Sequence, residues 1–171
     1  MSSVLYGLNV PMAASRVSSY LRSLASVLKA KGAVVGVSGD LNSAVVLGLA
    51  VMAFKASRVL GVVAYDGRTT PRGEVEDALL VCELLGVRSV IVDLSDAYTA
   101  LLKSMPYVAE ARAKALEELK ACVRRAVLQH YATMHGYMLL GVRDKSELLL
   151  GLFNKHADYS VDALPLGDIY R

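Results

Sequence analysis

The sequence has only two cysteines in 171 residues and no strong excess of charge of either sign. Cys82 and Cys122 stand in helix-like segments, without a Cys-x-x-Cys pattern or a nearby histidine partner. This excludes a disulfide framework and a zinc site. The 19 basic and 16 acidic residues leave a formal charge of +3, and aromatic residues make up only 6%. Both figures argue against a nucleic-acid-binding module.

Long hydrophobic runs are also missing. The uncharged, mainly apolar run Leu41 to Phe54 is shorter than the roughly 20 apolar residues that a membrane-spanning helix needs. The hydrophobic fraction is nevertheless 54%, which is enough to build one core and excludes a disordered chain. We therefore expect a single domain over residues 1–171 that is cytoplasmic and does not bind a membrane.

Acidic residues are absent before Asp40, where serines and arginines occur instead, as in a mitochondrial presequence. Apolar residues of the same stretch recur at helical spacing, which favours a helix that faces the core of the domain. These residues are Val17, Tyr20, Leu21, Leu24, Val27 and Leu28.

Short apolar runs alternate with amphipathic segments along most of the remaining chain. The runs, each predicted to be a strand buried on both faces, are Ala33 to Val37, Val59 to Ala64, Ser89 to Val92 and Tyr137 to Leu140. The predicted helices are Ser43 to Ala56, Arg72 to Leu85 and Val108 to His135. This alternation predicts an α/β fold with a doubly wound parallel sheet, and residues 154–171 are expected to be a loop-rich end.

The loop after the first predicted strand is the first place to look for a ligand, because parallel sheets bind ligands beyond the carboxyl ends of their strands. It reads Ser38-Gly39-Asp40-Leu41-Asn42-Ser43 and leads into a helix. Short side chains, two serine hydroxyls and a helix amino terminus are typical of a phosphate-binding loop. An ordinary strand-to-helix turn with Asn42 or Ser43 as its N-cap explains the spacing equally well.

Four segments together resemble the ammonia-dependent NAD synthetases, a family of N-type ATP pyrophosphatases. Residues 35–44 are similar to the family's pyrophosphate loop, Ser-Gly-Gly-x-Asp-Ser. Residues 140–148 are similar to its Leu-Gly-Thr-Gly-Asn-Lys-Ser-Glu segment. Residues 68–71 with 76–78 resemble its adenine-side loop and helix start, and residues 154–171 resemble its Lys-Tyr-Gly-Asp region.

The resemblance implies an adenine nucleotide α-hydrolase-like, Rossmann-like fold and a reaction in two steps. The carboxylate of nicotinic acid adenine dinucleotide attacks the α-phosphate of ATP and releases pyrophosphate, and ammonia then displaces AMP. The family uses ATP with Mg²⁺. Its members pair through helices, so we expect a homodimer through the predicted helix 108–135, which carries more apolar residues than one face requires.

The site residues that the resemblance implies fall into three sets. Those expected at ATP are Ser38, Gly39, Asp40, Asn42, Ser43, Arg68, Val142 and Arg171. Those expected at the dinucleotide are Cys122, Arg124, Lys155, Asp158 and Asp162. Glu147 and Asn42 are expected at Mg²⁺.

Several positions depart from the family's pattern. Asp40 replaces the second loop glycine and places a carboxylate where pyrophosphate should approach, a repulsion of about 4 kcal/mol at about 4 Å and an effective dielectric constant of about 20. Asn42 replaces an aspartate that binds magnesium. Cys122 replaces an arginine and Val142 a threonine, and the family's segment after Arg171 is expected to be absent.

These departures predict an NAD-synthetase-like protein that is catalytically impaired and retains dinucleotide binding or a structural role. The alternative is an active, divergent synthetase, or a related ATP pyrophosphatase, that a separate chain completes. Asp40 and Arg143 each replace a glycine on loops that should face each other. We expect them to form an ion pair that fills the pyrophosphate site, unless both side chains point to water.

Overall fold

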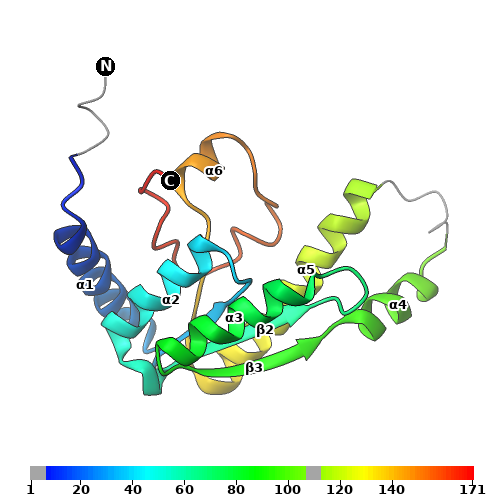
Figure 1. The fold of residues 1–171 in the computed structure, drawn as a ribbon, viewed down its shortest axis with the longest axis horizontal. Helices are drawn as coiled ribbons and strands as arrows, with labels where there is room; N and C mark the ends of the chain where they lie inside the picture. Colours follow the sequence, from blue (N-terminus) through cyan, green and yellow to red (C-terminus); the bar gives the residue numbers. More distant parts are fainter. Residues whose placement is uncertain (1–6, 107–112) are drawn as a thin grey trace.

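A four-stranded parallel sheet lies at the centre of the computed structural model, which describes residues 7–106 and 113–171 (Figure 1). The strands are β1 (Ala33–Gly36), β2 (Val59–Tyr65), β3 (Arg88–Asp93) and β4 (Met138–Leu140), in the order β3-β2-β1-β4. Ala33 of β1 pairs with Val59 on one side and with Met138 on the other. The strand order reverses between β1 and β4, so their carboxyl ends form the switch point of the sheet.

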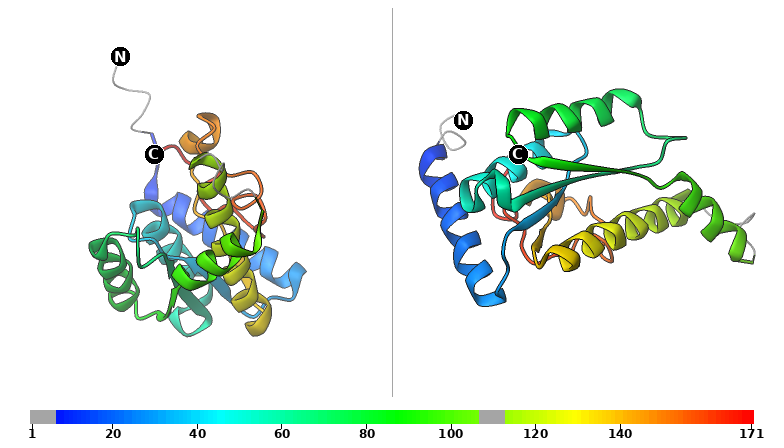
Figure 2. Two further views of the ribbon diagram at one scale, coloured as in Figure 1. Left: turned by 90° about the vertical axis from the view of Figure 1, so that its right-hand side faces the viewer. Right: turned by 90° about the horizontal axis from the view of Figure 1, so that it is seen from below.

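Helices cover both faces of the sheet, which confirms the predicted doubly wound α/β fold. α1 (Val10–Leu28), α2 (Leu41–Phe54) and α3 (Arg72–Leu84) contribute to the core on one face, and α5 (Ala113–His135) packs on the other. In the right-hand view of Figure 2, α3 and α5 lie on opposite sides of the strands. The shorter helices are η1 (Ala56–Arg58), α4 (Ser95–Ser104) and α6 (Lys145–Leu149). None of the described helices is long and apolar enough to cross a bilayer.

The side chains of β1 alternate between two cores, which explains why its sequence is continuously apolar. Val34 is fully buried in the core under α5, with Leu139 and Ala132. Val35 is fully buried in the opposite core, with Leu47 of α2. A strand without a solvent face needs no polar alternation.

Most element boundaries lie within one or two residues of the prediction, but two elements differ in kind. β3 is an edge strand, because β2 alone among the described strands pairs with it, and Ile91 on one of its faces is 53% exposed; the prediction that it is buried on both faces is therefore wrong. α4 was not predicted, since it follows β3 after one residue and buries only Ser95 and Tyr98. Residues 108–112 of the predicted helix 108–135 lie outside the described residues.

α1 is a helix, as predicted, but only part of its apolar set faces the core. Leu21 is fully buried, and Val17 and Leu24 pack against the core. Tyr20, Val27 and Leu28 are exposed, at 55%, 78% and 48%. α1 packs mainly on α2, and a single partner helix covers one stripe of residues.

Residues 154–171 contain turns and no helix, as expected for a loop-rich end, yet they pack closely along β4. Ala163 forms a parallel bridge with Leu140. The backbone N–H of Leu139 donates to Asp162 Oδ2 at 2.7 Å. Ala163 and Leu166 are buried, so this segment extends the core beyond β4.

Candidate functional site

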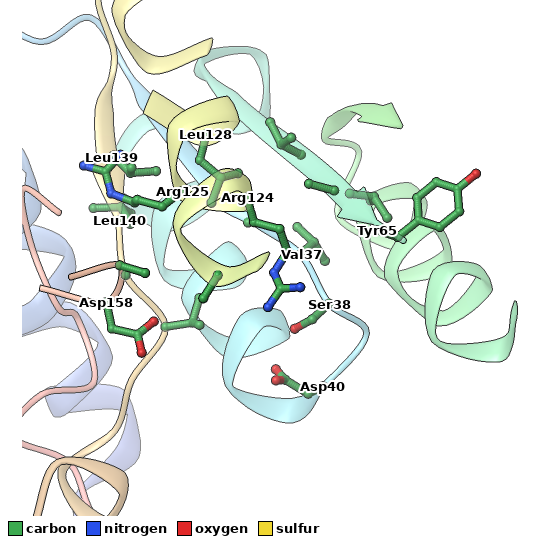
Figure 3. A pocket seen from close by; sticks show the side chains of 18 of the residues that line it. Val37, Ser38, Asp40, Tyr65, Arg124, Arg125, Leu128, Leu139, Leu140 and Asp158 are labelled. Carbon is green, nitrogen blue, oxygen red and sulfur yellow. The ribbon is translucent and has the colours of Figure 1, made fainter. Parts of the chain in front are cut away.

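A cavity of about 390 Å³ opens at the carboxyl ends of β1, β2 and β4, at the switch point of the sheet (Figure 3). The loop after β1 lines it with Ser38 and Asp40, and α5 lines it with Arg124 and Arg125. Asp158 of the loop-rich end also lines it. This volume is typical of a small-molecule site. The loop predicted to bind phosphate therefore borders a cavity of suitable size.

Asp40 is the N-cap of α2, where Asn42 or Ser43 was the predicted cap. Gly39, with a φ of 83°, turns the chain so that Asp40 precedes the first helical residue. Asp40 Oδ1 accepts a hydrogen bond from the backbone N–H of Ser43 at 2.7 Å. The carboxylate thus lies at the positive end of the α2 dipole, which offsets part of its charge.

Ser43 is fully buried and its hydroxyl is used within the loop. The hydroxyl donates to the carbonyl oxygen of Asp40 at 3.1 Å and accepts from the backbone N–H of Ser38 at 3.3 Å. In this arrangement Ser43 has no hydroxyl proton left for a phosphate. Ser38, which is exposed and lines the cavity, is the remaining hydroxyl of the loop.

Arg124 points from α5 toward the part of the loop that carries Ser38 and Asp40 (Figure 3). It takes part in none of the ion pairs found between described residues. Its neighbour Arg125, which the sequence analysis did not single out, donates to Gln129 Oε1 at 2.9 Å. The only signal for Arg125 was its position beside Arg124 on the same helix. Arg124 therefore supplies a cationic donor to the cavity.

Asn42 lies behind the loop, 7% exposed, and bridges two carboxylates. Its Nδ2 donates to Asp144 Oδ2 at 3.0 Å and to Glu147 Oε2 at 2.9 Å. Asp144 and Glu147 also form a capping box at the start of α6, with Asp144 Oδ1 accepting from the N–H of Glu147 at 2.8 Å. That N–H lowers the pKa of the Asp144 carboxyl despite burial, and the Asn42 amide adds to the effect.

Arg143 binds two carboxylates on its own side of the cavity. Its Nη1 donates to Glu147 Oε1 at 2.7 Å, and its Nε lies 3.1 Å from Asp158 Oδ2. The described residues contain no ion pair between Arg143 and Asp40. The expected salt bridge across the pyrophosphate site is therefore wrong, because nearer carboxylates take the guanidinium and the α2 amino terminus takes Asp40.

The carboxylate oxygens at Asp144 and Glu147 are not available as ligands for a resident divalent cation in this arrangement. Glu147 Oε2 accepts from the N–H of Asp144 at 3.2 Å as well as from Asn42, so every carboxylate oxygen of Asp144 and Glu147 already accepts a hydrogen bond. Within the described ranges, no group of three His, Cys, Asp or Glu residues is placed to hold a metal. An ion at Glu147 would have to displace Asn42 or Arg143.

A second polar cluster fixes the turn after β2. Asp66 is 6% exposed; its Oδ2 lies 3.1 Å from Lys120 Nζ and accepts from the Thr69 hydroxyl at 2.8 Å. Its Oδ1 accepts from the N–H of Arg68 at 3.1 Å and from the Ser95 hydroxyl at 3.2 Å. Burial alone would raise the pKa of Asp66, but the hydrogen bonds from Thr69, Lys120 and Arg68 lower it to about 2. Sequence reasoning missed this residue, whose only signal was an acid directly after a buried strand.

The structure divides the predicted site residues into groups. Those that line the cavity are Ser38, Asp40, Arg124, Val142 and Asp158. Gly39 and Ser43 shape the loop, and Asn42 and Glu147 meet behind it. The residues outside the cavity lining are Arg68, Cys122, Lys155, Asp162 and Arg171. Of these, Arg68 pairs with Asp96 at 3.4 Å and Asp162 accepts from β4.

Comparisons with known proteins agree with this geometry. A family model described as NAD synthase matches residues 13–171. The NH3-dependent NAD+ synthetase of Methanococcoides burtonii is 40% identical over 141 residues, covering 82% of this chain and 53% of that protein. That of Hyperthermus butylicus is 37% identical over 158 residues, covering 92% and 56%. The chain thus spans about half the length of these relatives.

A solved structure shares the fold. The NH3-dependent NAD synthetase from Campylobacter jejuni, in complex with the nitrate ion, has a TM-score of 0.87 and 23% identity to this chain. The match covers 96% of this chain and 69% of that one. At this identity the likeness establishes the architecture.

Proposed function

The chain belongs to the NAD synthase family, and on this premise we propose that it carries out the ATP-dependent amidation of nicotinic acid adenine dinucleotide with ammonia. A carboxylate oxygen of the dinucleotide bonds to the α-phosphorus of ATP as the bond to pyrophosphate breaks. Ammonia then bonds to the acyl carbon, AMP leaves and a proton passes to solvent. The relatives are named as synthetases, which supports this active reading over the impaired one.

The observation that carries the proposal is the placement of Arg124 opposite the loop after β1, across the cavity. A guanidinium forms charge-assisted hydrogen bonds with phosphate oxygens, which are stronger than hydrogen bonds between neutral groups. The capping bond holds Asp40 on α2. Arg124 takes part in no ion pair between described residues, so its charge is available for the phosphates of a nucleotide.

Mg²⁺ enters this proposal only as part of the substrate Mg-ATP. The carboxylates of Asp144 and Glu147 are occupied by protein donors, so we assign no step to a resident ion. The chain's own residues bind and orient the nucleotides, and the closely packed residues 154–171 border the cavity with Asp158.

The test is a reaction of the chain with Mg-ATP, nicotinic acid adenine dinucleotide and ammonium, followed by chromatography of the nucleotides. We expect NAD and AMP to form in equal amounts. Calorimetric titration with ATP and with the dinucleotide, each alone, measures binding separately from turnover. A folded protein that binds neither nucleotide and forms no NAD contradicts the proposal.

Arg124→Gln is expected to weaken binding of the phosphate-bearing substrates about tenfold, or about 1.4 kcal/mol, because the charged donor at the cavity is lost. The increase should appear in KM and in the calorimetric Kd. Arg16→Gln is the matched control, since Arg16 is exposed on α1, away from the cavity lining. Equal binding by the two variants would remove Arg124 from the site.

We also propose that the chain pairs as a homodimer through α5. Val127 and Leu128 of α5 are half-buried and pack against the core, Leu116 and Val123 are also half-buried, and Met134 is 56% exposed. Apolar surface of this kind marks interaction sites. Light scattering at micromolar concentration is expected to give the mass of a dimer, and a monomer mass would refute this proposal.

A further inference from the structure

Asn42 holds together two carboxylates from a distant part of the chain. One amide nitrogen lies 3.0 Å from Asp144 Oδ2 and 2.9 Å from Glu147 Oε2, so two negatively charged groups converge on a neutral donor. Like charges at such separations repel unless donors or a cation lie between them. The two N–H bonds of the Asn42 amide occupy that place.

The direction of the amide follows from its neighbours. The opposite orientation would bring the Asn42 oxygen against both carboxylates, so the –NH2 group must face them. Arg143 supplies the positive charge at the remaining oxygen, 2.7 Å from Glu147 Oε1, and also pairs with Asp158 at 3.1 Å. Glu147 is only 18% exposed, so this guanidinium acts on a largely desolvated carboxylate.

We infer that Asn42 and Arg143 stabilise the carboxylates of Asp144 and Glu147 in place of a divalent cation. The residue at position 42 determines whether side-chain donors or a bound cation lie between these carboxylates. The chain then keeps no resident metal ion beside its phosphate loop. The inference rests on the proposed function in one respect only, that the metal arrives and leaves with the nucleotide. An aspartate at position 42 would bring three carboxylates together, the ligand type that hard divalent cations prefer.

The test is a titration of the nucleotide-free chain with Mn²⁺, followed by the electron paramagnetic resonance signal of the free ion. Wild type is expected to leave this signal unchanged up to millimolar Mn²⁺. Asn42→Asp is expected to bind Mn²⁺ at least about tenfold more tightly. Asn9→Asp adds the same charge at the exposed N-cap of α1, where aspartate caps equally well, and should behave as wild type.

Thermal unfolding provides a second readout. Asn42→Asp should unfold at a lower temperature than wild type without metal and regain stability when Mn²⁺ is added, because a bound ion stabilises the folded state. Wild type should gain no stability. If Asn42→Asp does not fold, Mn²⁺ titration of wild type and of Glu147→Gln still tests whether the native chain has a metal site.

Tight Mn²⁺ binding by wild type that Glu147→Gln abolishes would overturn the inference. It would leave the proposed function intact, because NAD formation is measured separately. Failure to form NAD would contradict the proposed function and would not alter the result with the nucleotide-free chain. The two failures are therefore distinguishable.

Discussion

Replacing Asp66 with alanine is expected to lower the free energy of unfolding by about 3 kcal/mol, because the change removes one member of a buried ion pair and the acceptor for several donors. Lys120, only 20% exposed in its side chain, would lose the carboxylate that lies 3.1 Å from its Nζ. The hydroxyl of Thr69 would lose its acceptor, whereas the hydroxyl of Ser95 would keep Asp93 Oδ1 as an acceptor. Urea unfolding at neutral pH measures the change.

Asp96→Ala is the matched control, since Asp96 is fully exposed and its one ion pair with a described residue is with Arg68, at 3.4 Å. Its cost should stay below about 0.5 kcal/mol. The pKa of Asp66 falls from 3.8 to about 2 on folding, so its stabilisation is present above pH 3.8 and is lost as the pH falls through about 2. The difference between wild type and Asp66→Ala should shrink over that range. A constant difference would show that Asp66 acts through packing rather than through its charge.

Gly39→Ala is expected to cost about 3 kcal/mol and to abolish nucleotide binding. The φ of 83° at this position costs an L-residue about 1 to 2 kcal/mol. The added Cβ would also lie 2.5 Å from the carbonyl oxygen of Glu74 and 3.2 Å from the Cβ of Asp77, so the loop would have to move away from α3. Thermal unfolding and calorimetric titration with ATP measure the two effects.

Gly151→Ala separates the two causes. Gly151 has a φ of 71°, but no atom lies within 4 Å of its added Cβ, so only the backbone cost of about 1 kcal/mol applies. Nucleotide binding should persist in this variant. If both variants lose the same stability and Gly39→Ala still binds ATP, the loop tolerates displacement and the close approach to α3 is not needed for binding.

The fold was predictable because its signals are local. β1 and β2 are apolar along their whole length, and α5 shows a helical period, whereas α2 is apolar on nearly every side and is distinguished from a strand by its length. β3 and α4 were harder to predict, since Ile91 is apolar yet 53% exposed, and the sequence does not reveal which strand lies at an edge. The same holds for α1, where the partner helix decides which apolar stripe is buried.

The site was predictable only in its position. The strand-loop-helix pattern placed Ser38 and Asp40 beside a cavity, but partners within the site depend on tertiary contacts. Arg143 was expected to meet Asp40 and instead meets Glu147 and Asp158. Asn42, seen from the sequence as a weakened metal ligand, is a donor to two carboxylates. Residue types alone do not specify which of several acids a guanidinium or an amide contacts.

The pairing of β1 with β4 also has a kinetic consequence. β1, β2 and β3 follow one another along the chain, so their pairing closes short crossovers. The β1–β4 pair closes a much longer loop: Asn42 and Asp144 meet beside it and are 102 residues apart in the sequence. Closing so long a loop costs more entropy and proceeds more slowly than closing short ones. We therefore expect the wall of the cavity that carries Arg143 and Asp158 to be added last during folding. Until that step, the phosphate loop would lack the side of the cavity that Arg143 and Asp158 form.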